Sequence, residues 1–194
     1  TKIPDPNFEK FLINEKYDWQ APDGQVLTAN ISTIKTLNVN GLNISDLTGI
    51  EGFKALTHLI CSFNNLTALD VSQNTSLTVL NCFSNKITSL NLSKNTSLDN
   101  LNCASNLLTA LDISAITYIR TVNCYDNKLK ALNLTNNPNL GSLNCSANDF
   151  TNGLNLFGNP NLTFLNCNFT NLTNLDLSEN KSLQLLNCQG NSLK

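Results

Sequence analysis

Residues Leu77 to Ser97 read LTVLNCFSNKITSLNLSKNTS, and the pattern in this stretch decides the fold. The frame LxxLxCxxNxLxxLxLxxNxx recurs along the chain, in units that begin at Ile34, Leu56, Leu77, Leu98, Ile119, Leu140, Leu162 and Leu183. Successive cysteines lie 21 residues apart, with one spacing of 22: Cys61, Cys82, Cys103, Cys124, Cys145, Cys167 and Cys188. Self-similarity at such a period predicts units that stack into a solenoid.

Apolar side chains alternate around each cysteine, as they do in a strand with one buried face. One strand per unit predicts a parallel sheet of coils about 4.8 Å apart, with leucine and cysteine columns forming the core. An asparagine eight positions after the first leucine marks the turn out of the strand, where its amide can bond backbone groups of two coils. Leu42 and Thr170 replace it in two units, where we expect the ladder to be interrupted.

Each unit also contains two similar halves, LNCFSN and LNLSKN in the quoted stretch. This doubling resembles the bacterial 21-residue type of leucine-rich repeat protein, and the first unit, IKTLNVNGLNISDLTGIEGFKA, is similar to the 22-residue repeat of internalin-like proteins. The resemblance implies a leucine-rich repeat solenoid over 34–194: a parallel β-sheet of about eight repeats, the last one truncated. It also implies a second short extended ladder on the opposite wall, with leucine pairs such as Leu90 and Leu92 facing inward.

Residues 1–33 lie outside the repeat and predict an N-terminal cap. Asp5 followed by Pro6 is typical of a helix start, and Phe8, Phe11 and Leu12 share one face of a helix over about 5–16. We expect this helix, with Trp19, Val26 and Leu27, to cover the end of the first coil, because terminal units need such a cap. Because the last unit stops at Lys194 within a repeat, we also expect the chain to be part of a longer polypeptide.

Composition excludes several classes of function. Asn (35) and Leu (34) dominate the 194 residues, whereas charged residues are only 13% and the net charge is −2. This argues against nucleic acid as a partner, and no apolar run reaches the roughly 18 residues needed for membrane insertion. One histidine, His58, and no recognisable nucleophile or phosphate-binding motif predict that the chain is not an enzyme and uses no cofactor.

The cysteines and acidic residues do not suggest a metal site. Each cysteine is alone in its unit, so zinc spacing is absent and a column of buried thiols is favoured. Disulfides between neighbouring coils are not excluded by the spacing. Asp18 and Asp23 lack the ladder of ligands of a calcium loop. On the opposite wall we expect the acids and amides to bond the Ser or Thr found two residues later in most units: Asp70, Asn91, Asp112, Asn133, Asn155 and Asp176.

The outward face of the sheet combines amides with aromatic rings. The candidate ligand-binding residues on this concave face are His58, Phe63, Phe83, Asn102, Asn123, Tyr125, Asn144, Phe164 and Phe169. Two interpretations compete: exposed rings among amides suit a protein or sugar ligand, or the stacked asparagines satisfy one another up the ladder and bind nothing.

The resemblance to secreted and surface proteins of bacteria implies a function of the same kind. We expect a non-catalytic, extracellular or cell-surface module for protein binding or adhesion, with a protein ligand. A carbohydrate-binding module of a larger secreted protein, with a glycan ligand, and a structural spacer are the alternatives.

Overall fold

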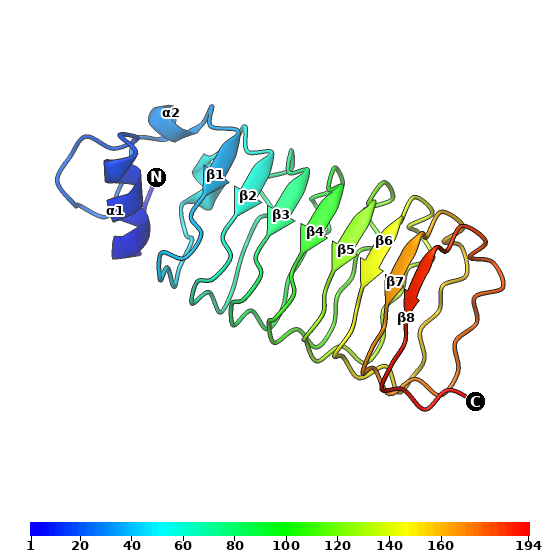
Figure 1. The fold of residues 1–194 in the computed structure, drawn as a ribbon. Coiled ribbons are helices and arrows are strands. Elements are labelled where there is room, and N and C mark those ends of the chain that lie inside the picture. The colour runs from blue at the N-terminus through cyan, green and yellow to red at the C-terminus, as the bar shows by residue number, and fades with distance from the viewer.

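Each repeat contributes one three-residue strand, and the eight strands form one parallel sheet in chain order in the computed structural model, which describes residues 1–194. The strands are β1 (Thr36–Asn38), β2 (His58–Ile60), β3 (Val79–Asn81), β4 (Asn100–Asn102), β5 (Thr121–Asn123), β6 (Ser142–Asn144), β7 (Phe164–Asn166) and β8 (Leu185–Asn187). Figure 1 shows them side by side along one wall of the solenoid, with the N-terminal helices at one end. The predicted leucine-rich repeat solenoid is confirmed.

The register of the sheet follows the repeat, so equivalent residues meet. Leu80 pairs with Leu101, and Leu143 pairs with Leu165 although 22 residues separate them. The extra residue of that unit lies on the opposite wall between Phe150 and Leu154. There the N–H of Gly153, which has a φ of +88°, bonds the Phe150 carbonyl at 2.8 Å. The insertion is absorbed in a turn that glycine permits, and the strand columns stay aligned.

The cysteines form the predicted column inside the solenoid. Six of the seven are buried, Cys188 in the last coil is partly exposed, and all are free thiols. Burial raises the pKa of Cys82 to about 12 and that of Cys167, beside Cys188, to about 11. It also raises the thiol pKa well above its usual value at Cys61, Cys103, Cys124 and Cys145, where neighbouring thiols add to the effect. These sulfurs therefore pack as small apolar groups and stay protonated at neutral pH.

The predicted asparagine ladder joins each coil to the one before it. In the fourth coil, Nδ2 of Asn106 donates to the carbonyl of Cys82 in the preceding coil at 3.0 Å and to the carbonyl of Cys103 in the same coil at 3.1 Å. Its Oδ1 accepts the N–H of Ile87 at 3.0 Å. The same pattern of bonds recurs at Asn64, Asn85, Asn127, Asn148 and Asn191.

The ladder is interrupted at Thr170, as the sequence predicts. The Thr170 hydroxyl donates to the Cys167 carbonyl of its own coil at 2.7 Å and has no amide to reach the preceding coil. The N–H of Phe150, which an asparagine there would bond, donates instead to the Thr170 backbone carbonyl at 2.8 Å. In the first coil, where Leu42 replaces the asparagine, the Leu42 N–H donates to Oδ1 of Asn64 in the second coil.

A second asparagine ladder lies at the opposite corner of each coil. Asn95 is fully buried, and its Nδ2 donates to the carbonyls of Val71 at 2.9 Å and Asn74 at 3.0 Å in the preceding coil. Equivalent bonds are made by Asn74, Asn137, Asn159 and Asn180. Ile116 takes this place in one coil and is buried as an apolar substitute. Coils with an asparagine at both places are therefore tied to their predecessors at two corners, and the coils with Thr170 or Ile116 are tied by an asparagine at one corner.

The opposite wall is extended but irregular. Its paired apolar side chains face inward as predicted, for example Leu90 at 8% exposure and Leu92 at 1%. The second ladder is present only in rudimentary form, because the backbones of Asn133 and Asn155 make its single parallel bridge.

The cap is built on the helix α1 (Pro6–Asn14). Oδ1 of Asp5 accepts the N–H groups of Asn7 and Phe8 at the start of α1, and its Oδ2 accepts the Ser45 N–H of the first coil at 2.7 Å. The Phe8 ring stacks on Phe53 with centroids 6.2 Å apart. A second short helix, α2 (Thr28–Ile31), and the 3-10 turn η1 (Ile50–Gly52) complete this end.

The cap departs from expectation at two apolar residues. Val26 is buried, but Trp19 is 76% exposed and Leu27 is 61% exposed. Trp19 follows the end of α1 in the turn over residues 17–24, and this turn directs it to solvent. None of the helices is both long and apolar enough to cross a membrane.

Replacing a ladder asparagine should destabilise the whole solenoid. Asn106→Ala leaves the buried Ile87 N–H without its acceptor and removes one of the two amide bonds to the Cys82 carbonyl, to which Asn85 still donates, so we expect a loss of about 2–3 kcal/mol in the free energy of unfolding. Asn100→Ala removes an exposed amide on the sheet surface and should cost less than about 0.5 kcal/mol. Urea denaturation followed by circular dichroism measures both values, and equal losses would contradict the role of the ladder.

The buried thiols should resist alkylation in the folded protein. At pH 8, we expect iodoacetamide to label Cys188 and to leave the other six cysteines unmodified until urea is added. Peptide mass spectrometry locates the label. Stability should also fall as pH rises from about 9, where an unfolded thiol ionises, towards the folded Cys82 pKa of about 12, since only the unfolded chain loses protons in that window. A urea midpoint that is constant between pH 8 and pH 10.5 would contradict this.

Candidate functional site

Three aromatic rings meet on the outer surface of the sheet. The Phe63 and Phe83 rings have centroids 4.9 Å apart and an interplanar angle of 88°, which is an edge-to-face contact. Phe83 and Tyr125 are 6.1 Å apart at 39°. Phe63 is 56% exposed, while Phe83 and Tyr125 are half-buried. We call Phe63, Phe83 and Tyr125 the aromatic cluster.

A small residue between two large ones explains how these rings meet. Phe83 follows β3 and Tyr125 follows β5, so they lie at equivalent positions two coils apart, about 10 Å along the stack. Ala104 occupies this position in the coil between them and is fully buried. Because alanine leaves this space open, the two rings lean towards each other over it. Phe63 reaches Phe83 from the next position along, where its backbone has a φ of +53°.

The amides of Asn102, Asn123 and Asn144 form a column beside the cluster. Oδ1 of Asn102 accepts the N–H of Ala104 at 3.3 Å, and Oδ1 of Asn144 accepts both the N–H and the hydroxyl of Ser146. Oδ1 of Asn123 is buried without a partner. None of the three NH₂ groups donates to another protein group.

The interpretation that these asparagines satisfy one another up the ladder is therefore wrong. The oxygens of Asn102 and Asn144 bond backbone N–H groups two residues later in the same coil, a local bond that asparagine forms readily, and the oxygen of Asn123 bonds no neighbouring asparagine. Their NH₂ groups remain available as donors at the spacing of the strands.

The other candidates lie apart from the aromatic cluster. His58 begins β2, is exposed, and has its Nδ1 2.9 Å from the Thr57 hydroxyl. Phe164 lies in β7 between Ser142 and Leu185, two coils beyond Tyr125. Phe169 is 63% exposed in that same coil, and its ring lies against Gly190, where a Cβ atom would come within 2.2 Å of it. The structure thus places the candidates on one face but brings only three rings together.

The acidic residues of the opposite wall make local bonds, as expected. Oδ1 of Asp70, Asp112 and Asp176 each accepts a serine N–H at 2.9 Å. These bonds lower the carboxyl pKa: the Ser72 N–H acts first at Asp70, the Ser114 hydroxyl first at Asp112 and the Ser178 N–H first at Asp176. These carboxylates therefore stabilise the turns that contain the serines.

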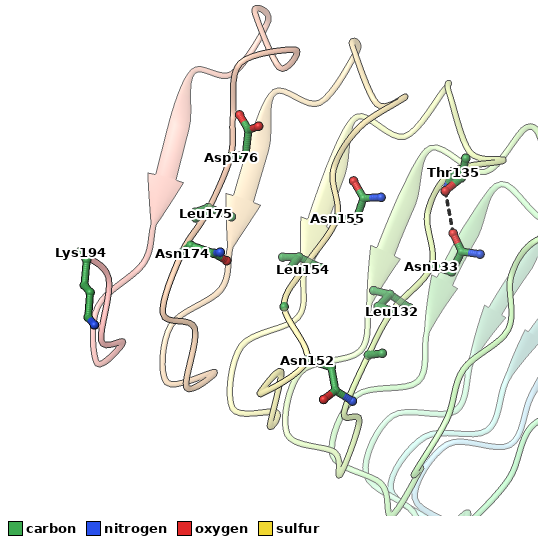
Figure 2. Close-up of a pocket in the computed structure, with 12 residues that line it drawn as sticks. Leu132, Asn133, Thr135, Asn152, Leu154, Asn155, Asn174, Leu175, Asp176 and Lys194 are labelled. Atoms are coloured by element: carbon green, nitrogen blue, oxygen red, sulfur yellow. Dashed lines mark hydrogen bonds between the residues drawn. The ribbon is translucent and has the colours of Figure 1, made fainter.

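A shallow groove of about 890 Å³ on this wall was not predicted from the sequence. Figure 2 shows Leu132, Leu154 and Leu175 from three successive coils, with Asn133, Asn155 and Asp176 beside them and Lys194 at the end. Asn133 accepts a bond from the Thr135 hydroxyl at 2.8 Å. The groove has amides and one charge of each sign but no aromatic ring among its lining residues. The signal in the sequence is the 22-residue unit, because Asn152 and Gly153 of its insertion line the groove.

Comparisons with known proteins agree with this architecture. The sequence matches no family model. Over 73 residues, 38% of the chain, it is 40% identical to Internalin J of Listeria monocytogenes, of which this covers 8%. The solved functional domain of InlJ from the same organism, which includes a cysteine ladder, is 33% identical and has a TM-score of 0.56. That likeness covers 98% of this chain and 51% of the InlJ chain.

Likeness at lower identity concerns the fold alone. The internalin C2 structure from L. monocytogenes has a TM-score of 0.68 at 17% identity, covering 95% of this chain and 93% of that one. The chain spans about half of the solved InlJ domain and a small part of the whole Internalin J sequence. The repeat frame, the sheet and these similarities together identify the chain as a bacterial leucine-rich repeat protein with internalin-like repeats.

Proposed function

We propose that this chain is a non-catalytic protein-binding module that acts in adhesion, outside the bacterial cell or on its surface. Its ligand would be a protein, held on the concave face of the sheet. The observation that carries the proposal is the aromatic cluster beside a column of amides whose NH₂ groups have no protein partner. The similarity to Internalin J supports a surface or secreted location.

The aromatic cluster provides the anchor. Its rings hold one another by an edge-to-face contact and by packing over Ala104, so little side-chain freedom is lost when a ligand covers them. Aromatic residues are enriched among the side chains that dominate binding energy at interfaces. The apolar contact therefore centres on Phe63, Phe83 and Tyr125.

The amide column provides directional hydrogen bonds to the ligand. The NH₂ groups of Asn102, Asn123 and Asn144 lie on adjacent strands β4, β5 and β6, at a spacing of about 4.8 Å. They can donate to backbone carbonyls or side-chain oxygens of a partner, and a rigid sheet fixes the distances between them. Near neutrality of the chain makes long-range charge attraction a minor part of recognition.

A glycan is the second candidate, because stacked rings next to amide donors also suit sugar rings and hydroxyl groups. Against a glycan, the aromatic cluster forms part of a broad open sheet, and the groove of about 890 Å³ lies on the opposite wall without any aromatic lining. A spacer role is disfavoured by the free NH₂ groups and the exposed ring of Phe63.

Removing two anchor rings should abolish ligand binding while the fold stays intact. We expect the Phe83→Ala/Tyr125→Ala double variant to lose at least 30-fold in affinity for a protein partner, corresponding to about 2 kcal/mol or more. Arrays of bacterial and host surface proteins, probed in parallel with a glycan array, identify the ligand, and biolayer interferometry measures its affinity.

A matched control comes from rings that are exposed elsewhere. Tyr118→Ala/Phe157→Ala removes two aromatic side chains, 74% and 67% exposed, from outside the sheet and should bind as the wild type does. Circular dichroism and melting temperature check that both variants fold. Equal binding by the two double variants would refute the concave site, and binding to sugars alone would replace protein with glycan as the ligand.

A further inference from the structure

Three carboxylates meet in the N-terminal cap. Glu9 comes from α1, and Asp18 and Asp23 come from the turn that follows it. One oxygen of each lies within 4.8 Å of the others. Glu9 is 6% exposed and Asp18 is 4% exposed, so two of the three acids are buried.

One oxygen of this group has no partner at all. Oδ1 of Asp18 accepts a long bond of 3.3 Å from the Gln20 N–H, whereas its Oδ2 is buried and has no hydrogen-bond donor. No other carboxylate in the chain has a buried oxygen in this state. A carboxylate oxygen that is removed from water needs a donor, a proton or a cation to offset its desolvation.

The protein provides no cation for these acids. The single ion pair of the chain joins Arg120 and Asp99 in the solenoid, far along the sequence from the cap. Glu9 and Asp23 bond only backbone N–H groups: Oε1 of Glu9 accepts those of Asp23 and Gly24, and Oδ1 of Asp23 accepts that of Gln25. Three negative groups thus face one another without a lysine or arginine among them.

We propose that Glu9, Asp18 and Asp23 bind a calcium ion. All three donors are carboxylate oxygens, which hard divalent cations prefer, and two of the acids are held in place by burial. Calcium–oxygen distances of about 2.3–2.6 Å allow two ligands of one ion to lie up to about 5.2 Å apart, so oxygens that lie within 4.8 Å of one another can share one ion. Calcium also accepts irregular coordination, whereas magnesium demands near-ideal octahedral geometry at distances near 2.1 Å. Waters and backbone carbonyls would complete the coordination.

The ion would fasten the cap together. Glu9 already holds the turn through its bonds to the Asp23 and Gly24 N–H groups, and the Gly24 carbonyl accepts the N–H of Ile3 at 2.8 Å. A cation shared by α1 and this turn would strengthen that connection. Because Phe8 on α1 packs on Phe53, the covering of the first coil would be strengthened with it.

Calcium titration of the 194-residue chain tests the proposal with two readouts. After treatment with EDTA, added calcium should raise the melting temperature in a saturable manner. Terbium, a luminescent substitute for calcium, should emit when Tyr17 and Trp19, which flank Asp18, are excited, and calcium should quench that emission by displacement.

Charge-matched variants locate the effect. Asp18→Asn should weaken calcium and terbium binding at least 10-fold, whereas Asp112→Asn removes an exposed carboxylate of the opposite wall and should leave both responses unchanged. If Asp18→Asn fails to fold, Asp23→Asn, at an exposed position of the same cluster, takes its place. Absence of both responses in the wild type, an equal loss in the cluster variant and Asp112→Asn, or a response to magnesium with none to calcium would each overturn the proposal.

Discussion

The structure depends on one interaction that repeats in every coil after the first, the hydrogen bonding of asparagine side chains to backbone groups of the preceding coil. A three-residue strand per coil satisfies few backbone groups, and the rest of each coil turns sharply around a core of leucine and cysteine. Asn106 and its equivalents bond backbone N–H and carbonyl groups at one corner, and Asn95 and its equivalents bond carbonyl groups at the other. Without these side chains, such groups would be buried without partners. Eleven of the 35 asparagines in the chain meet this requirement.

This construction also determines what the surface can do. Coils of fixed spacing align side chains in columns, so chemistry is displayed across a sheet and is not gathered into a pocket. Variation within a column then creates local features. Ala104 between Phe83 and Tyr125 lets two rings meet, and the Asn102 and Asn144 oxygens make local bonds while their NH₂ groups have no protein partner. The N-terminal cap lies outside the repeat, and there the only group of three carboxylates forms.

Much of the fold was predictable because the repeat spacing restricts it at every level. The strand columns, the buried thiols, the asparagine at the turn and its interruption at Thr170 all follow from one frame. The candidate site was less accessible. The repeat assigns its residues to one face of the sheet. The contact of Phe63, Phe83 and Tyr125, however, depends on how the rings pack over a neighbouring coil. Whether an amide bonds the next asparagine of its column or the backbone of its own coil depends on local turn geometry. Asp18 and Asp23 showed no calcium pattern because the third acid, Glu9, lies nine residues or more away on a helix. Trp19 was expected to help cover the first coil, but the turn that contains it exposes it.

Native-state hydrogen exchange at the amides that bond ladder asparagines tests the central claim most directly. The N–H groups of Ile87, Leu108 and Leu129 donate to Oδ1 of Asn106, Asn127 and Asn148 in the following coils. If these side chains join the coils into one cooperative unit, the three amides will exchange with the free energy of global unfolding. Exchange of each amide at its own, much lower free energy would show that the coils open singly and that the asparagine ladder does not hold the solenoid together.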